Sequence, residues 1–346
     1  SFVTANAGKR LAISEADKLP DTTNERERLM IPVMDNEKLE SLLDFAVMIK
    51  GDTNRLPIDL LSVVQDSKEA KGKVILNQKK LEKAIKHGAE TDTTVQVLNR
   101  VDLNLSNGVA RAVKERLTSD IVLQWEEKSG GATDFFVNSL FGTTTQNIID
   151  AVWETVYICR FQHPVNTARK IVLVLTPNAQ YEIGFKYWVK KMGLLSRQAG
   201  ARLMICSTAE TRQAFQNELK KSRSNIEVTY TPFENIEDFL ILSREISRDD
   251  LIVVVSARKG TLSYHSYMDT IPDKLLKHFG DNNFILLYPE QTEVEFLESG
   301  VQSDDLSLSP IQEQIDNLNK LGKAVKKIFS PGSLKSSESS DEENKQ

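Results

Sequence analysis

Short apolar runs alternate with longer amphipathic segments along most of this chain. Apolar residues are nearly continuous over 171–175 and 251–255, which is typical of strands buried on both faces of a parallel sheet. Between such runs, apolar residues return at helical spacing, as Leu39, Leu42 and Leu43 do. The pattern therefore predicts an α/β protein in which strands alternate with helices and the sheets are mainly parallel.

The alternation occurs twice, which predicts two tandem open-sheet units, each built on a five-stranded sheet. The first repeat covers residues 28–161 and the second covers residues 169–289. Strands of the first repeat are expected over 28–34, 58–64, 94–101, 120–125 and 154–159. Those of the second are expected over 170–175, 201–206, 226–230, 251–255 and 284–287. Helices are expected over 39–49, 74–87, 104–117, 181–199, 209–221, 235–246 and 271–279, and a shorter one before 154.

Two pairs of segments align the repeats with each other. Residues 119–123 resemble 249–253, which matches Asp120 with Asp250. Residues 154–158 match 282–286 in the same way. Because the linker between the repeats is short, we expect them to pack together as a pseudo-dimer.

Three segments lie outside the repeats. Residues 1–27 form a lead with little apolar pattern, and the chain does not open with Met. Residues 290–329 include apolar positions near one helical face, which predicts an amphipathic helix. Residues 330–346 are mostly Ser, Glu, Asp and Lys, and we expect this tail to be disordered.

Composition narrows the class of protein. A chain of 346 residues is too long for one ordinary hydrophobic core. Its net charge of -5 argues against nucleic-acid binding through a basic surface. No apolar stretch approaches the roughly 20 residues that span a bilayer, so we expect the chain itself to be soluble. Cys159 and Cys206 lie inside apolar runs, which predicts buried, reduced thiols and suits a cytosolic protein.

Candidate binding residues follow the strands of the first repeat. Asp35 comes directly after the first strand, where a carboxylate can accept hydrogen bonds from a ribose or adenine, or can cap the next helix. Val64 ends the second strand and is expected beside the same group. The loop after the fourth strand offers glycines and threonines that either surround a phosphate or form a turn and a helix cap. They are Gly130, Gly131, Gly142, Thr143 and Thr144.

The second repeat lacks these residues. Thr176 and Pro177 stand where the acidic residue is expected, and its loop holds a single glycine. Arg258 and Lys259 in that loop either meet a phosphate or, as we expect, are solvated charges. His265 is the one candidate general base, and the histidines show no metal-ligand spacing. We therefore expect no metal site, no catalytic residues and no enzymatic activity.

Residues 28–160 and 170–289 resemble universal stress protein domains, which have the adenine nucleotide alpha hydrolase-like fold. That resemblance implies binding of ATP or AMP through an acidic residue after the first strand, matched by Asp35, and a Gly-x2-Gly-x9-Gly-Ser/Thr loop after the fourth. Gly131 and Gly142-Thr143 match this loop with one extra residue between the glycines. The nucleotide is expected in the first repeat only.

The tandem arrangement with a lead and a polar tail resembles the C-terminal cytosolic region of bacterial monovalent cation:proton (Na⁺/H⁺) antiporters. Residues 2–12 look like the chain leaving a last membrane helix, with Lys9 and Arg10 on the inner side. The resemblance implies a regulatory or sensor domain at the cytoplasmic face of the inner membrane. Its partner would be the transmembrane antiporter domain of the same polypeptide. The alternatives are a free-standing tandem universal stress protein that binds ATP or AMP, and a nucleotide hydrolase using the same cleft. Besides the pseudo-dimer within the chain, a homodimer of two chains is left open.

Overall fold

Every strand predicted from the sequence belongs to one sheet. The computed structural model describes residues 27–34, 38–126, 143–221 and 226–291, and all of these lie in the first of two compact units, residues 1–301. The first repeat supplies β1 (Leu29–Pro32), β2 (Ile58–Gln65), β3 (Val95–Asp102), β4 (Asp120–Gln124) and β5 (Thr155–Arg160). The second repeat supplies β6 (Lys170–Val174), β7 (Arg202–Ser207), β8 (Val228–Pro232), β9 (Leu251–Val255) and β10 (Asn283–Tyr288).

The two five-stranded sheets expected from the sequence are the two halves of this one sheet. Its order is β3-β2-β1-β4-β5-β10-β9-β6-β7-β8, so the strands of the two repeats do not interleave. Pairing is parallel within each repeat, and the antiparallel pairing of β5 with β10 joins them, with Ile158 opposite Leu286. The order has the same pattern from either edge, as expected for two repeats related by a pseudo-twofold axis through this joint.

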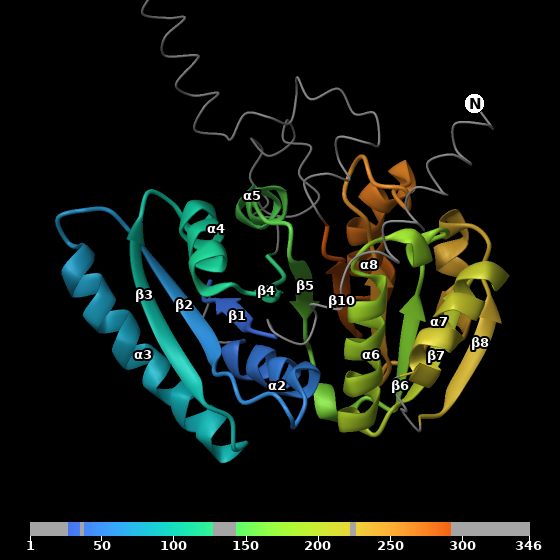
Figure 1. Cartoon of the computed structure of the whole chain (residues 1–346), viewed down its shortest axis with the longest axis horizontal. Helices are drawn as coiled ribbons and strands as arrows, with labels where there is room; N and C mark the ends of the chain where they lie inside the picture. Colours follow the sequence, from blue (N-terminus) through green and yellow to red (C-terminus); the bar gives the residue numbers. More distant parts are fainter. Residues whose placement is uncertain (1–26, 35–37, 127–142, 222–225, 292–346) are drawn as a thin grey trace, which may run out of the picture. The chain divides into compact units, whose positions relative to one another are not determined.

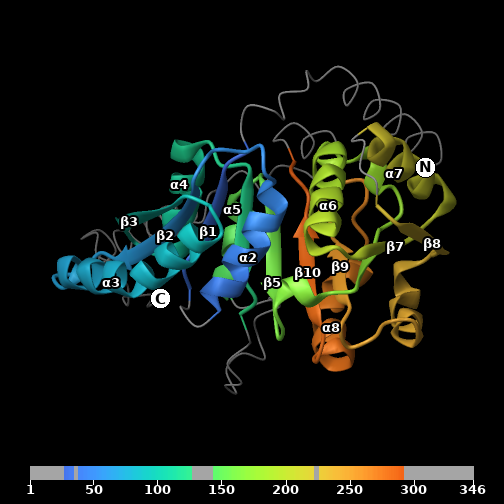
Figure 2. The same ribbon diagram turned by 90° about the horizontal axis from the view of Figure 1, so that it is seen from below.

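Helices cover both faces of the sheet, as Figures 1 and 2 show. One face packs against α2 (Leu39–Lys50), α3 (Ala70–Glu90), α6 (Phe185–Ala199) and α7 (Ala209–Lys221). The other packs against α4 (Leu105–Arg116), α5 (Thr143–Ala151), η5 (Ile236–Arg244) and α8 (Ile271–Phe279). Short 3₁₀ turns are η3 (Val165–Thr167), η4 (Ala179–Tyr181) and η6 (Ser266–Thr270). The expectation of a doubly covered, mainly parallel α/β fold is confirmed.

One predicted α-helix is a 3₁₀-helix. The apolar residues of η5 that reach the core are Ile236, Phe239 and Leu242. They follow one another at intervals of three, which matches the three residues per turn of a 3₁₀-helix better than the α-helical period. The prediction of an α-helix over 235–246 is therefore wrong, because the apolar positions repeat every three residues.

The alignment of Asp120 with Asp250 is wrong by one residue. Asp120 pairs with Thr155, whereas Leu251 pairs with Asn283. Ile158 and Leu286 lie opposite each other at the centre of the joint, and Thr155 and Asn283 precede them by three residues. Thr155 and Asn283 are therefore equivalent positions in the two repeats. Asp120 therefore takes the place that apolar Leu251 takes in the second repeat, and a carboxylate enters the core.

Both cysteines are buried, as the sequence predicted. Burial raises the pKa of the Cys206 thiol to about 12 and that of Cys159 well above its usual value. Since the thiolate is the reactive form, we expect neither thiol to react with an aromatic disulfide reagent at pH 8 in the folded protein. Both should react after denaturation in urea, and rapid reaction of either one before unfolding would contradict this placement.

Candidate functional site

A pocket opens at the carboxyl ends of the strands of the first repeat. Its volume is about 430 Å³, within the range of small-molecule sites. It lies where β1, β4 and β5 end, beside the first turn of α2. Its apolar walls are Met34, Leu42, Trp125, Cys159 and Phe161, and its polar lining is Lys38, Gln124, Glu126, Arg160 and Gln162.

The topology explains why this pocket forms here. The chain passes from β1 outward to β2 and β3 and then returns to β4 on the other side of β1. The loops after β1 and β4 therefore diverge, which leaves a crevice at the carboxyl edge of an open parallel sheet. The pocket occupies this point of divergence, and its position agrees with the edge predicted from the sequence.

Charged groups of both signs line the pocket. Lys38 is exposed immediately before α2. The guanidinium of Arg160 lies 5.5 Å from the centre of the Phe284 ring and donates to the carbonyl of Gly280 at 2.5 Å. Glu126 accepts a hydrogen bond from the Thr145 hydroxyl at 3.3 Å, which ties the end of β4 to the first turn of α5. Two cations beside one carboxylate suit a ligand that carries both an anionic group and hydrogen-bond donors.

The residues predicted from the sequence are placed only in part. Asp35, Gly130, Gly131 and Gly142 lie outside the described residues. Met34, which precedes Asp35, lines the pocket. Thr143 directly follows Gly142 in the sequence and is the first residue of α5, and Thr144 lies in the first turn of that helix.

Sequence reasoning also proposed a residue that lies apart from the pocket and missed others that line it. Val64 is buried near the end of β2 and does not line the pocket. Lys38, Arg160 and Gln162 were missed. The position of Arg160 at the end of the fifth strand was the available signal, since carboxyl ends of parallel strands meet at one edge.

The corresponding edge of the second repeat is filled by its own side chains. Glu182 is 3% exposed, and one carboxylate oxygen accepts hydrogen bonds from the backbone N–H of Ser263, at 2.8 Å, and from the Ser263 hydroxyl. The other oxygen accepts from Gln291 Nε2 at 2.8 Å. Ser263 belongs to the loop after β9, which corresponds to the predicted phosphate loop of the first repeat. An internal carboxylate thus takes the hydrogen bonds that an anion would receive there.

Arg258 corrects another expectation, since it is buried and not a solvated loop charge. Its guanidinium donates to the carbonyl of Pro289, and also to those of Val152 at 3.2 Å and Glu154 at 2.9 Å. Burial lowers the pKa of Arg258 to about 10, which leaves it charged at neutral pH. The physical reason is that the turns preceding β5 and following β10 leave these carbonyls without strand partners, and one guanidinium satisfies all three.

Two further loop residues of the second repeat are accounted for. The side chain of Lys259 is 74% exposed, as expected of a solvated charge. His265 precedes η6, and its Nδ1 accepts a hydrogen bond from the backbone N–H of Tyr267 at 3.2 Å. That contact is a helix cap, so the geometry gives His265 a structural role here.

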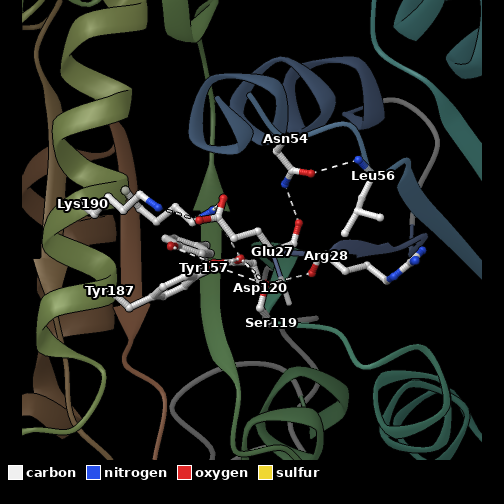
Figure 3. Close-up of polar contacts among 10 residues, drawn as sticks. Glu27, Arg28, Asn54, Leu56, Ser119, Asp120, Tyr157, Tyr187 and Lys190 are labelled. Carbon is white, nitrogen blue, oxygen red and sulfur yellow. Dashed lines mark hydrogen bonds and ion pairs between the residues drawn. The ribbon is translucent and has the colours of Figure 1, made fainter. Parts of the chain in front are cut away.

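A buried polar network crosses the joint between the repeats (Figure 3). Asp120 is fully buried and accepts hydrogen bonds from Ser119 Oγ at 2.7 Å and Tyr157 OH at 3.2 Å, and also from Tyr187 OH on α6. Lys191 Nζ, also fully buried, lies 3.7 Å from Asp120. Burial, followed by the charge of Asp120, raises the pKa of both tyrosines well above the usual value, so both hydroxyls stay donors.

The same network holds the residues that lead into β1. Glu27 pairs with Lys190 at 2.7 Å and with Lys191 at 3.5 Å, both on α6 of the second repeat. Arg28 lies 3.3 Å from the buried carboxylate of Asp59 on β2, which Arg116 also contacts at 3.0 Å. The entry of the chain into the sheet is therefore fixed to both repeats.

Among the described residues, no group of three or more His, Cys, Asp or Glu side chains is arranged to hold a metal ion. Within the same residues, no helix has both the length and the apolar character needed to cross a bilayer.

Comparison with known proteins bears on the fold. No protein-family profile matches the chain, and no curated protein sequence matches it. The cytoplasmic domain of a prokaryotic cation chloride cotransporter matches with a TM-score of 0.50 and 16% identity, over 79% of this chain and 98% of that one. A universal stress protein from Archaeoglobus fulgidus DSM 4304 matches with a TM-score of 0.48 and 14% identity, over 75% and 97%. A putative universal stress protein from Pseudomonas aeruginosa UCBPP-PA14 gives a TM-score of 0.48 and 14% identity, over 81% and 98%.

The class that fold and site define is an α/β protein of two open-sheet repeats, with a pocket at the carboxyl edge of the first repeat. The cotransporter domain shares this fold, and at 16% identity the likeness extends to the fold alone.

Proposed function

We propose that this chain is a cytosolic regulatory domain of a monovalent cation:proton antiporter and that its first repeat binds an adenine nucleotide. The observation that carries the ligand proposal is the contrast between the repeats. The first has an open pocket of about 430 Å³ at its carboxyl edge, whereas Glu182 and Arg258 fill the second. The transport context is supported by the likeness in fold to the cotransporter cytoplasmic domain, 98% of which is covered by the match.

Different residues of the first repeat would bind different parts of the nucleotide. Asp35 would accept hydrogen bonds from ribose or adenine, and the apolar wall formed by Met34, Leu42 and Phe161 would contact the base. Lys38 and Arg160 would attract the phosphates from one side. The backbone N–H groups of Gly130, Gly131, Gly142, Thr143 and Thr144 would receive them from the other.

Regulation requires that the nucleotide bind two states of the transporter with different affinity. The site lies at the ends of β4 and β5, and β5 forms the joint with the second repeat. A ligand that binds at the end of β4 would therefore act next to the surface that fixes one repeat to the other. Such a ligand would favour one arrangement of the transporter.

Calorimetric titration tests the ligand. We expect ATP or AMP to bind at one site per chain without being hydrolysed. Gly142→Val should weaken binding by about 1–3 kcal/mol, the size of a lost charge-assisted hydrogen bond, and Asp35→Ala should weaken it similarly. Lys38→Glu should weaken binding several-fold because it reverses a charge at the pocket.

The matched control is Lys259→Glu, which reverses an exposed lysine in the loop of the second repeat. It should leave affinity unchanged. If binding survives Gly142→Val and Lys38→Glu but is lost with Lys259→Glu, the ligand binds the second repeat and the proposed site is wrong. If neither ATP nor AMP binds at millimolar concentration, the nucleotide proposal is wrong.

The coding sequence upstream of Ser1 tests the transporter context separately. We expect it to encode a series of apolar helices of about 20 residues each, because such lengths span a bilayer. An initiator Met shortly before Ser1, with no apolar helices encoded ahead of it, would instead indicate a free-standing tandem universal stress protein. The calorimetric result would stand in either case.

A further inference from the structure

The outward face of α3 is unlike the rest of the described surface. This helix packs on the sheet through Leu81 and Ala84 and lies over β3, the outermost strand. Its opposite side carries bulky apolar residues in solvent: Ile75 is 60% exposed and Leu76 is 54% exposed. Val101 on β3, on the side of the sheet that α3 covers, is exposed as well. Exposed aliphatic side chains that gather on one element indicate a surface that contacts something else.

The charge of α3 is opposite to that of the chain. Residues 70–90 contain six lysines and two glutamates, a net charge of +4 in a chain whose total is -5, so the remainder carries -9. Lysines on α3 that are exposed are Lys71, Lys73, Lys79, Lys83 and Lys86. Lys73 and Lys83 pair with Glu69 at 3.6 Å and Glu40 at 2.7 Å. The other three have no ion-pair partner within the described part of the chain.

Helical spacing brings these two kinds of side chain onto the same face. Ile75, Lys79 and Lys83 follow one another at intervals of four residues, and Leu76 precedes Lys79 by three. Lys86 lies two turns beyond Lys79 on the same side. The outward face therefore presents two aliphatic side chains at one end and a row of ammonium groups along its length.

We infer that this face of α3 docks on the surface of a bilayer that contains anionic phospholipid. Ammonium groups at the ends of long side chains would lie among the lipid phosphates, while Ile75 and Leu76 would enter the boundary between headgroups and acyl chains. Each lysine near such a surface contributes about 1 kcal/mol. A nucleic acid would satisfy the lysines, but its phosphate backbone offers nothing to two exposed aliphatic side chains.

The charge of α3 sets the orientation. Its net charge of +4, in a chain that is negative overall, would favour an approach to an anionic surface through the β3 edge of the first repeat. This inference does not depend on nucleotide binding, because α3 contributes no residue to the pocket.

Co-sedimentation of the full chain with lipid vesicles tests the inference. We expect the chain to bind vesicles made of equal parts phosphatidylcholine and phosphatidylglycerol, and to remain in solution with phosphatidylcholine alone. Binding should weaken as salt is raised. The double variant Lys79→Glu/Lys86→Glu should weaken binding at least tenfold. The double variant Ile75→Ser/Leu76→Ser should also weaken it several-fold.

Matched controls change the same residue types elsewhere. Lys220→Glu/Lys221→Glu alters two exposed lysines at the end of α7, and Ile241→Ser alters an isoleucine that is 62% exposed on η5. Neither should change vesicle binding. The inference is overturned if the α3 variants bind as tightly as the unmodified chain, or if neutral vesicles bind equally well. Stronger binding to RNA or heparin that ignores Ile75→Ser/Leu76→Ser would show that α3 serves a different polyanion.

Discussion

Replacing Asp120 by alanine is expected to lower the free energy of unfolding by about 3–5 kcal/mol. The substitution leaves Lys191, which is fully buried, with Glu27 as its remaining carboxylate partner at 3.5 Å. It also removes the acceptor for the hydroxyls of Tyr157 and Tyr187 inside the core. Urea unfolding followed by circular dichroism measures the change.

Asp281→Ala serves as the control, because this aspartate is exposed and its loss should cost less than about 0.5 kcal/mol. A sharper comparison uses the second repeat, where Leu251 stands in the place of Asp120. Asp120→Leu/Lys191→Met removes both charges together and should be less destabilising than Asp120→Leu alone. A double variant as unstable as the sum of the two single variants would show that the two charges do not interact.

Replacing Arg258 by alanine is expected to lower the free energy of unfolding by about 2–4 kcal/mol, the second large effect. Its guanidinium donates to three carbonyls, of Val152 and Glu154 in the first repeat and of Pro289 in the second. Leaving buried acceptors without a donor costs about 1–3 kcal/mol for each group that water cannot reach. Differential scanning calorimetry and urea unfolding should agree on the loss.

The neighbouring residue supplies the comparison for Arg258. Lys259→Ala removes an exposed ammonium whose nearest carboxylate is Asp269 at 3.7 Å, and it should change stability by less than about 0.5 kcal/mol. Equal losses for the two variants would mean that Arg258 contributes through surface charge alone. Arg258→Lys should recover only part of the loss, because one ammonium does not reproduce the planar arrangement of donors.

Both large effects involve contacts that cross from one repeat to the other. Asp120 reaches Tyr187 on α6, and Arg258 reaches the turn before β5. Since β5 also borders the pocket, the residues that join the repeats and those that line the site share an element. That arrangement is what a ligand at the pocket would need in order to affect the joint.

The sequence alone determined the elements and their order. Runs such as those of β6 and β9 are apolar at nearly every position, and this composition is stable only as a strand covered on both faces. The helices between them repeat their apolar residues at helical spacing, so α4 and α7 begin and end within a residue or two of the prediction. The edge at which a ligand would bind followed from the same alternation, because parallel strands place all their carboxyl ends together.

Only the tertiary structure decided how the repeats meet. Nothing in the pattern marks β5 and β10 as strands that pair with each other, because each carries a run of apolar residues like that of β9. Asp120 and Arg258 were read as a strand-leading carboxylate and a loop cation, since their partners lie 67 and 106 residues away in Tyr187 and Val152. A charged side chain is buried when distant groups satisfy its hydrogen bonds, and local sequence does not contain those distant groups.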